Sequence, residues 1–400
     1  MHARVPRMTW LGLLLGVACA LSRPGSADTV GLTAYGSTQL NAAVERWLSS
    51  GGYRRAPALS VAVGVNGQLV FARGYGEARP GLPATEHTVY HIGSLSKQFT
   101  AAAVLGLVDR GALAPRSNNA MTLASSARDF FADVDNWEGS GHGPVTLRGL
   151  LTMTSGLPSL IAHPPAQADP WGTITSTRML EELRKLAVPG TSTGFVYNNS
   201  AYFLLAEIVE TVVAGDGRGT SSFADFVKGN IISRLGLSDT SFVGDYGSYS
   251  AMRTAMPSWG RTPAYRRRPA FVQADWLKGS ADMASSAFDL FTWNKALMGN
   301  DLLSAQSRHL MFSDAARVGA STYYGMGWFI EHSPGWDWYS HSGYVPGFTS
   351  SNMIARHSPD GTWISVSLLT NADGVSGLNE LASEIVRTVM HQTSAPGNAR

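Results

Sequence analysis

Ser94 and Lys97 are the residues whose types and spacing point most directly to chemistry. They form an S-x-x-K motif that occurs once in the chain, at the start of a segment, 94–107, with apolar residues at helical spacing. Side chains three residues apart share one face of a helix, so the hydroxyl and the amine come within reach of each other. The helix N-terminus favours negative charge beside Ser94. Serine becomes a nucleophile when a base removes its proton, and lysine can be that base where burial lowers its pKa.

The rarity of lysine adds weight to this motif. Only five of the 31 basic residues are lysines, so the chain places a lysine at position 97 against a strong bias toward arginine. Arginine cannot act as the base because its pKa is too high. For the motif in isolation, a capping serine followed by a surface lysine is the alternative interpretation.

Tyr197 and Asn199 form a second candidate group. They stand two residues apart, just before an apolar segment, 201–213, that is typical of a helix. A tight loop there would aim both side chains into one site. A tyrosine beside a cationic lysine can shuttle protons, and an asparagine offers a donor and an acceptor to a substrate amide. The alternative is a core tyrosine followed by a helix-capping asparagine.

His341, Gly343 and Tyr344 form a third group, within a strand-like run of residues. A glycine lets a substrate backbone approach a strand edge closely, and the N–H group of Tyr344 is expected to pair with that of Ser94 as an oxyanion hole. The alternative is a glycine-rich hairpin turn with a surface histidine.

The elements that must position these residues follow an ordered pattern. Alternating residues 59–65, an Asn66-Gly67 turn and residues 69–71 predict a hairpin, and further strands are expected at 325–330, 339–342, 349–355 and 362–369. Helices are expected at 39–47, 178–186 and 201–213, with a closing helix over 378–389. Strands at both ends and a helical middle predict an α+β fold in which an antiparallel sheet is interrupted by an inserted helical domain. The expected domains are residues 28–111 together with 279–400 for the sheet, and 112–278 for the helical insertion.

The N-terminus resembles an export signal. A basic start precedes an apolar run, 8–20, that is short for a membrane span, and small residues at 25–27 predict cleavage before Asp28. An uncleaved anchor is the alternative. Cys19, the single cysteine, lies in a faint lipoprotein-like box, which gives lipid attachment as a weaker possibility. Cleavage after Ala27 would remove Cys19 and leave a mature protein without thiols, located in the periplasm or outside the cell.

The three groups in this order resemble the serine β-lactamase and penicillin-binding-protein superfamily. The likeness is to its class C branch, which includes D-alanyl-D-alanine carboxypeptidases, D-aminopeptidases and class C-like esterases and carries S-x-x-K, then Y-x-N, then K-T-G or H-x-G. The likeness spans nearly all of the mature chain. The matching segments are 90–100 (YHIGSLSKQFT), 145–158 (VTLRGLLTMTSGLP), 324–328 (YGMGW) and 341–348 (HSGYVPGF).

The resemblance implies a β-lactamase/transpeptidase-like fold with its active site between the sheet and the helical insertion. It implies that Ser94 is acylated and that Lys97 and Tyr197 share the acid and base roles, without saying which of them takes the serine proton. The implied substrate-binding residues are Asn199, His341, Gly343 and Tyr344.

Two departures from the family pattern bear on the activity. Met153 stands where histidine is common, for which we expect only a packing consequence. His341 replaces the lysine of K-T-G, and histidine is mostly neutral near pH 7, so it offers no fixed cation for a substrate carboxylate. This favours a D-alanyl-D-alanine carboxypeptidase-like or other D-peptidase activity over a β-lactamase, with a carboxylesterase as the next alternative. A non-catalytic penicillin sensor or scaffold is the alternative outside the enzymes.

Two other motifs compete with this interpretation. Residues 190–194 match the G-x-S-x-G elbow of α/β-hydrolases around Ser192, but Pro189 precedes the motif and no helix follows directly. His87 and His91 stand four apart without the intervening glutamate of zinc proteases, so we expect structural roles for them. We therefore expect no metal and no cofactor.

Composition limits the class of partner. Charged residues are 15% of the 400-residue chain and the net charge is +2, which argues against a nucleic-acid partner. The expected partner is a small substrate: a D-amino-acid peptide, a β-lactam or an ester.

Overall fold

The computed structural model describes residues 34–50, 58–137, 143–160, 174–188, 194–215, 222–246, 275–372 and 375–393. Its helices are α1 (Ala34–Ser50), α2 (Ser96–Asp109), α3 (Leu147–Leu151), α4 (Ser176–Lys185), α5 (Asn199–Gly215), α6 (Phe223–Val227), α7 (Ser233–Leu235), α8 (Ala287–Met298), α9 (Ala305–Met311) and α10 (Leu378–Thr393). Its strands are β1 (Leu59–Val65), β2 (Gln68–Tyr75), β3 (Glu77–Arg79), β4 (Leu82–Pro83), β5 (Tyr90–His91), β6 (Ser241–Phe242), β7 (Met283–Ser285), β8 (Ala316–Arg317), β9 (Thr322–Tyr324), β10 (Phe329–Ser333), β11 (Trp336–Val345), β12 (Phe348–His357) and β13 (Trp363–Thr370).

A large sheet joins the two ends of the chain. Its strand order is β2-β1-β13-β12-β11-β10-β9-β8, and every neighbouring pair is antiparallel. The early hairpin β1–β2 is completed by β13, which lies next to β1 with Val63 opposite Val366. The sequence therefore cannot form this sheet until its last third is present.

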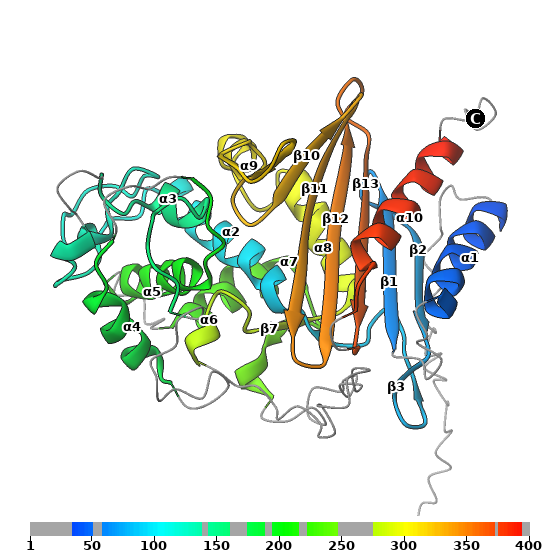
Figure 1. The fold of residues 1–400 in the computed structure, drawn as a ribbon, viewed down its shortest axis with the longest axis horizontal. Helices are drawn as coiled ribbons and strands as arrows, with labels where there is room; N and C mark the ends of the chain where they lie inside the picture. Colours follow the sequence, from blue (N-terminus) through cyan, green and yellow to red (C-terminus); the bar gives the residue numbers. More distant parts are fainter. Residues whose placement is uncertain are drawn as a thin grey trace, which may run out of the picture.

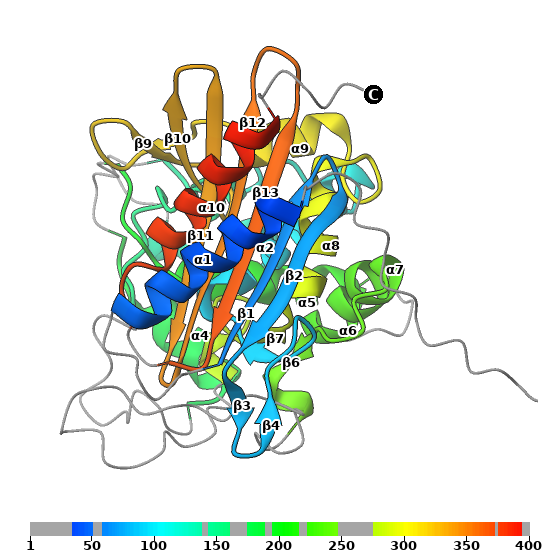
Figure 2. The same cartoon turned by 90° about the vertical axis from the view of Figure 1, so that its right-hand side faces the viewer.

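Helices cover both faces of the large sheet (Figures 1 and 2). The terminal helices α1 and α10 pack together on one face, where α10 contacts β12 and β13. On the other face, α8 contacts β1 and β13, and α2 lies between the sheet and the remaining helices α3 to α6. This arrangement confirms the expected α+β architecture of an antiparallel sheet flanked by helices.

Local sequence explains the elements that the prediction identified. Asn66 and Gly67 both have positive φ, 49° and 79°, which is the turn that a two-residue hairpin requires. The closing helix α10 is amphipathic and buries Leu381, Ile385 and Val389 against the sheet.

The expected strand 325–330 differs from the structure. β10 begins only at Phe329, and residues 325–328 form the turn that joins it to β9. Gly325 N–H donates to Trp328 O at 2.9 Å, and Gly327 has φ of +86°, a conformation that favours glycine. The apolar residues of this segment are buried in a turn, and burial alone does not distinguish a turn from a strand.

A second, three-stranded sheet links distant segments. β7 pairs with β5 on one side and with β6 on the other, so residues 241–242 of the helical middle pair with 283–285, which in turn pair with 90–91. The division into a sheet domain and an inserted helical domain at 112 and 278 stays a prediction.

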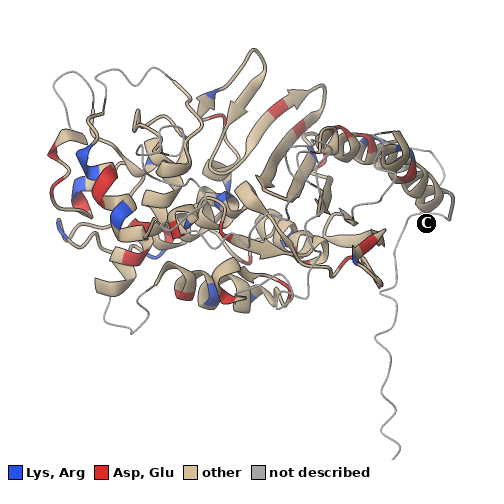
Figure 3. Cartoon of the chain, turned by 60° about the horizontal axis from the view of Figure 1, so that its bottom comes forward, with Lys and Arg blue, Asp and Glu red and all other residues tan. Residues whose placement is uncertain are grey.

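Charged residues are few, and they lie on strands and in loops as well as on helices (Figure 3). In Figure 3, blue and red segments are interspersed on the helices and most of the ribbon is tan. Among the helices that the structure describes, none combines the length and apolarity needed to cross a membrane.

Candidate active site

Ser94 lies on a short 3-10 turn, Gly93–Leu95, between β5 and α2, two residues before the α-helix begins. Hydrogen bonds fix this turn: Ile92 N–H donates to Met283 O at 3.1 Å, and Ser96 Oγ–H donates to Gly93 O at 2.7 Å. Gly93 has φ of +54°, and a Cβ built there would be 2.7 Å from the backbone nitrogen of Tyr344. The turn that carries Ser94 is therefore pressed against the end of β11.

The side chains of Lys97 and Tyr197 meet at Ser94. Lys97 Nζ lies 3.0 Å from Ser94 Oγ, and the Tyr197 hydroxyl donates to the same oxygen at 2.8 Å. Lys97 Nζ also lies 5.0 Å from the centre of the Tyr197 ring. Residues 103 positions apart thus converge on one hydroxyl, with a basic group and a phenol both within proton-transfer distance of it.

Lys97 is completely buried. Its other hydrogen bonds go to Asn199 Oδ1, at 2.6 Å, and to the backbone carbonyl of Ser280, at 2.8 Å. Burial lowers the pKa of Lys97 well below its usual range, and the charge of Asp282 opposes this effect. A lysine with a lowered pKa is available as a base at neutral pH.

The loop before α5 holds Tyr197 and Asn199 in place. Asn198, between them, is buried and accepts a hydrogen bond from Ala201 N–H at 3.2 Å, which caps the helix. The alternative interpretation of Asn199 as the helix cap is therefore wrong, because Asn198 caps the helix. The side chain of Asn199 contacts Lys97 instead. Burial raises the pKa of Tyr197 above its usual range, with the Ser94 hydrogen bond acting in the opposite direction, so its phenol is protonated at neutral pH.

His341 lies on β11, behind the catalytic candidates, and is 2% exposed, which excludes the surface histidine of the alternative interpretation. Its Nδ1–H donates to Ser342 O at 2.6 Å, and its ring centre lies 6.1 Å from that of Tyr197. Burial, aided by the nearby charge of Lys97, lowers the pKa of His341 to about 3. The ring is therefore neutral at physiological pH.

Gly343 and Tyr344 lie on β11 next to the nucleophile turn. A Cβ at Gly343 would be 2.0 Å from Ile92 O and 2.3 Å from Ser350 Oγ. The close approach that this glycine allows is thus between two parts of the chain itself, and its contact with substrate stays a prediction. The Tyr344 side chain is 50% exposed, and its backbone nitrogen adjoins Gly93, as an oxyanion pair with Ser94 would need.

Comparison with known proteins identifies the family. The β-lactamase family model matches residues 44–387 of the chain. The chain belongs to the β-lactamase family. Members of this family with penicillin-binding or amidase activity are serine hydrolases, which agrees with a serine at the centre of the site.

Curated relatives carry penicillin-binding names. Penicillin-binding protein 4* of Bacillus subtilis is 27% identical over 71% of the chain, and the aligned region spans only 61% of that protein's length. The putative penicillin-binding protein PbpX of Bacillus subtilis is 25% identical over 80% of the chain and 72% of its own length.

Solved structures support the β-lactamase fold. An octameric penicillin-binding protein homologue from Pyrococcus abyssi superposes with a TM-score of 0.71 at 24% identity, covering 88% of this chain and 77% of that one. The D-amino acid amidase of Ochrobactrum anthropi gives 0.69 at 22% identity, covering 89% of this chain and 100% of the amidase. At these identities the likeness shows the fold.

The structure adds residues to the β-lactamase-family site that the motifs did not indicate. The Ser280 carbonyl binds Lys97, and the Tyr202 ring lies 5.7 Å from Lys97 Nζ. Tyr324 hydroxyl lies 3.4 Å from His341 Nε2, which accepts its hydrogen bond. The sequence pattern around Tyr202 is that of an apolar helix, which predicts a core residue. The role of Ser280 depends on its backbone carbonyl, which every residue has, so no residue type could indicate it. In the sequence, Tyr324 stands out only as the first residue of the family-like segment 324–328.

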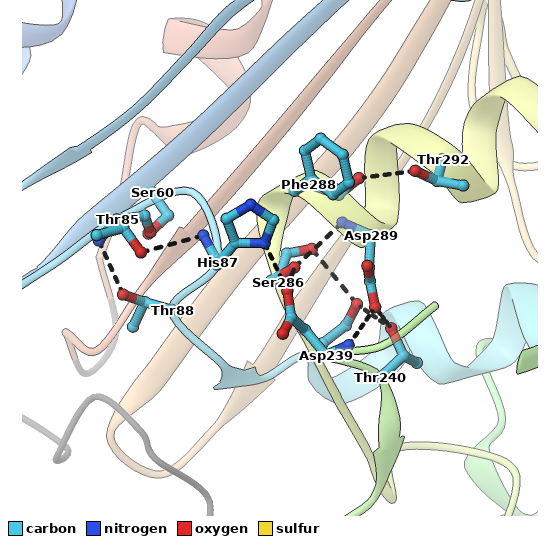
Figure 4. Close-up of polar contacts among 11 residues, drawn as sticks. Ser60, Thr85, His87, Thr88, Asp239, Thr240, Ser286, Phe288, Asp289 and Thr292 are labelled. Atoms are coloured by element: carbon cyan, nitrogen blue, oxygen red, sulfur yellow. Dashed lines mark hydrogen bonds and ion pairs between the residues drawn. The ribbon is translucent and has the colours of Figure 1, made fainter. Parts of the chain in front are cut away.

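The competing motifs lie elsewhere. Of the G-x-S-x-G segment, residues 190–193 lie outside the described residues. His87 Nδ1–H donates to Asp239 Oδ2 at 2.8 Å, and the His87 ring lies tilted against that of Phe288 with their centres 4.7 Å apart (Figure 4), whereas His91 is buried against Phe348. Within the described ranges, no group of three or more His, Cys, Asp or Glu side chains is arranged to hold a metal ion.

Proposed function

We propose that this protein hydrolyses D-amino-acid peptides or amides through an acyl-enzyme on Ser94, in the manner of a D-alanyl-D-alanine carboxypeptidase or a related D-peptidase. The observation that carries the proposal is the convergence of Lys97 Nζ and the Tyr197 hydroxyl on Ser94 Oγ, at 3.0 and 2.8 Å. Neither contact would be needed by a serine with only a structural role.

In the acylation step, neutral Lys97 takes the proton of the Ser94 hydroxyl. Ser94 Oγ then bonds to the substrate carbonyl carbon, and the carbonyl electrons move to its oxygen. The backbone N–H groups of Ser94 and Tyr344 are assigned to this oxyanion. We assign the base role to the lysine, because burial lowers the pKa of Lys97 and raises that of Tyr197, which favours a neutral amine over a phenolate.

When the tetrahedral intermediate collapses, the bond to the leaving amine breaks and the amine must gain a proton. Tyr197 is the donor, because its phenol is protonated and contacts the reacting oxygen. The phenolate regains its proton from the Lys97 ammonium. A water molecule, deprotonated by the same groups, then hydrolyses the ester to release the acid and restore the Ser94 hydroxyl.

Two observations support the substrate class. Similar proteins are named as penicillin-binding proteins and as a D-amino acid amidase, and these names support a D-configured amide as the substrate proposed for this chain. The Asn199 amide has its oxygen on Lys97, which leaves its NH₂ group for a substrate carbonyl.

Ester hydrolysis is a second candidate because of His341. Its neutral, buried ring provides no cation for the carboxylate of a peptide C-terminus or a β-lactam. A simple ester has no such carboxylate and needs only the nucleophile, the base and the oxyanion donors.

A substrate panel tests the proposal. Wild type and Ser94→Ala are assayed with a D-Ala-D-Ala peptide, a D-amino-acid amide, nitrocefin and p-nitrophenyl butyrate. We expect turnover of the D-configured compounds by wild type and loss of at least about 10³-fold in the variant. Full activity of Ser94→Ala on every compound that the wild type cleaves contradicts the mechanism, and acylation without release of product identifies a sensor instead.

We also propose that the protein is exported, on the basis of the sequence of residues 1–27. N-terminal sequencing of the mature protein from an exporting bacterium tests this. A first residue of Asp28 supports export to the periplasm or medium, and a retained Met1 contradicts it.

A further inference from the structure

Met153 occupies a position at the end of α3 that usually belongs to glycine. It follows the C-cap residue of this helix, Thr152. Met153 N–H donates to Leu150 O at 3.3 Å, and Thr154 N–H donates to Gly149 O at 2.8 Å. These two bonds form a Schellman motif, in which the residue after the C-cap takes a left-handed conformation. Met153 has that conformation, with φ of +57°. A glycine would end this helix without strain, so the helix itself does not account for the methionine.

The strain at Met153 is unusual for its residue type. The other non-glycine residues with positive φ in the described ranges are Asn66, Asn118 and Asp133, and asparagine and aspartate tolerate this conformation. A methionine in the same conformation costs free energy. Strained residues persist where surrounding contacts hold them in place, and they cluster at functional sites. The contacts of Met153 therefore bear on function.

Both the backbone and the side chain of Met153 bind the loop that carries Tyr197. Met153 O accepts from Val196 N–H at 3.0 Å, and Met153 Sδ accepts from Asn198 N–H at 3.4 Å. These donors belong to the residues directly before and after Tyr197. Met153 is 2% exposed and Asn198 is also buried, so the sulfur contact is shielded from solvent. The consequence of a methionine at this position thus extends beyond the packing effect expected from the sequence.

Only the side-chain contact depends on the residue type at position 153. Every residue there offers a backbone oxygen to Val196 N–H, whereas Asn198 N–H needs an acceptor in the side chain. A thioether is a weak acceptor, but without it this buried N–H group would have no partner among the described residues. Leucine has a similar volume and no acceptor, so it separates the hydrogen bond from the packing.

We propose that Met153 is a positioning residue for the reaction, which holds the Tyr197 phenol against Ser94 by accepting the N–H group of Asn198 with its sulfur. Tyr197 lies outside the helices and strands, so the bonds of its two neighbours fix its backbone. Its hydroxyl lies 2.8 Å from Ser94 Oγ. The proposal rests on the proposed function in one respect, namely the role of Tyr197 as the proton donor to the leaving amine.

The expected consequence is selective for the leaving group. Loss of the sulfur leaves Asn198 N–H unpaired, and the loop must shift for this donor to find another partner. Such a shift moves the adjacent Tyr197 away from its contact with Ser94. A leaving amine needs the proton of Tyr197, whereas p-nitrophenol leaves as a stable anion. Cleavage of an amide therefore decreases more than cleavage of an activated ester.

The test compares a D-amino-acid amide with the p-nitrophenyl ester of the same acid. Both give the same acyl-enzyme on Ser94, so the ratio of their kcat/KM values, amide over ester, reports on the leaving group. We expect Met153→Leu to lower this ratio about tenfold, and Tyr197→Phe to lower it further. In the Tyr197→Phe background, Met153→Leu should have no additional effect, because both residues act through one proton transfer. An unchanged ratio in Met153→Leu, or an additional decrease in the double variant, overturns the proposal.

Met179→Leu is the matched control, because Met179 is also buried but lies on α4. We expect its ratio to equal that of wild type. Met153→Gly covers a leucine variant that fails to fold: glycine fits the left-handed conformation and lacks the sulfur, so this variant must lower the ratio as well. A ratio that Tyr197→Phe leaves unchanged contradicts the proposed function of Tyr197. A ratio lowered by Tyr197→Phe and unaffected by the variants of Met153 contradicts only the role of Met153.

Discussion

At the residue scale, Lys97 is a fully buried amine, and burial disfavours its ammonium form. Lys97→Arg removes the base, because a guanidinium stays protonated at all working pH values. We expect kcat/KM to fall by about 10² to 10⁴-fold. Steady-state kinetics on a D-amino-acid amide measure this, with circular dichroism to check folding, and an Arg variant of near wild-type activity would refute a lysine base.

His341 gives a prediction about acid stability. Its pKa is about 3 in the folded protein and near 6.5 when unfolded, so the unfolded state binds one more proton between these values. The stability contributed by the neutral ring is complete above pH 6.5 and is lost as pH falls toward 3. Between these pH values the free energy of unfolding falls by about 1.4 kcal/mol for each unit by which the pH decreases.

Urea unfolding of wild type and His341→Gln between pH 7 and pH 4 isolates this contribution. Asp282 and Asp289 have raised pKa values and change stability in the opposite direction, so only the difference between the two proteins is diagnostic. Relative to the variant, wild type should lose stability as the pH decreases. A difference that is independent of pH would contradict a neutral, buried histidine.

The sequence predicted the residues of the site better than their contacts. Ser94, Lys97 and Tyr197 follow from residue type, spacing and order along the chain. That Gly343 would face Ile92, and that the Ser280 carbonyl would bind Lys97, depend on contacts between segments more than 180 residues apart. No local pattern records such contacts.

At the scale of elements, the N-terminus of α5 positions Tyr197. Asn198→Ala removes the cap of Ala201 N–H and the donor to Leu157 O. We expect about 1 to 2 kcal/mol lower stability, together with a fall in kcat because the phenol is held less firmly. Thr175→Ala, which removes the cap of α4 at Arg178 N–H, is the matched control and should lower stability without changing kcat. Equal kcat values for both variants would contradict a positioning role for this cap.

The contact between β11 and the nucleophile turn is tight enough to exclude a methyl group. In Gly343→Ala, the new Cβ would meet the backbone oxygen of Ile92, so β11 or the turn that carries Ser94 must shift. We expect the free energy of unfolding to fall by roughly 1 to 3 kcal/mol and the activity to fall markedly. Gly229→Ala, at a site with open space around the new methyl, should leave both unchanged. Thermal melts and kinetics compare the two, and a fully active Gly343→Ala would show that the contact is dispensable.

Sequence patterns identified elements with a clear local signature and missed those without one. The β1–β2 hairpin has its Asn66-Gly67 turn, and α10 has an apolar stripe. In contrast, α8 is buried on most of its surface, including Leu290, Trp293 and Leu297, so its apolar residues show no single face. The three-residue strand β7 is defined by its partners β5 and β6, which the sequence does not reveal.

At the scale of the whole molecule, the sheet is assembled from both ends of the chain, and the site lies where the middle of the chain meets it. Ser94 comes from the segment after β5, Tyr197 from the segment before α5, and His341 from β11. The alternation of strand-rich and helix-rich regions predicted this plan. The order of the strands did not follow from the sequence, because antiparallel pairing between β1 and β13 joins segments about 300 residues apart.

The central claim is that Ser94 becomes covalently acylated with Lys97 as its base. Intact-mass and peptide mass spectrometry after brief reaction with a penicillin or a D-amino-acid ester, followed by acid quenching, tests it directly. We predict one acyl group per chain, located on the peptide that contains Ser94, absent from Ser94→Ala and formed far more slowly in Lys97→Arg. An acyl group on another residue, or unchanged acylation of Ser94→Ala, would contradict the claim.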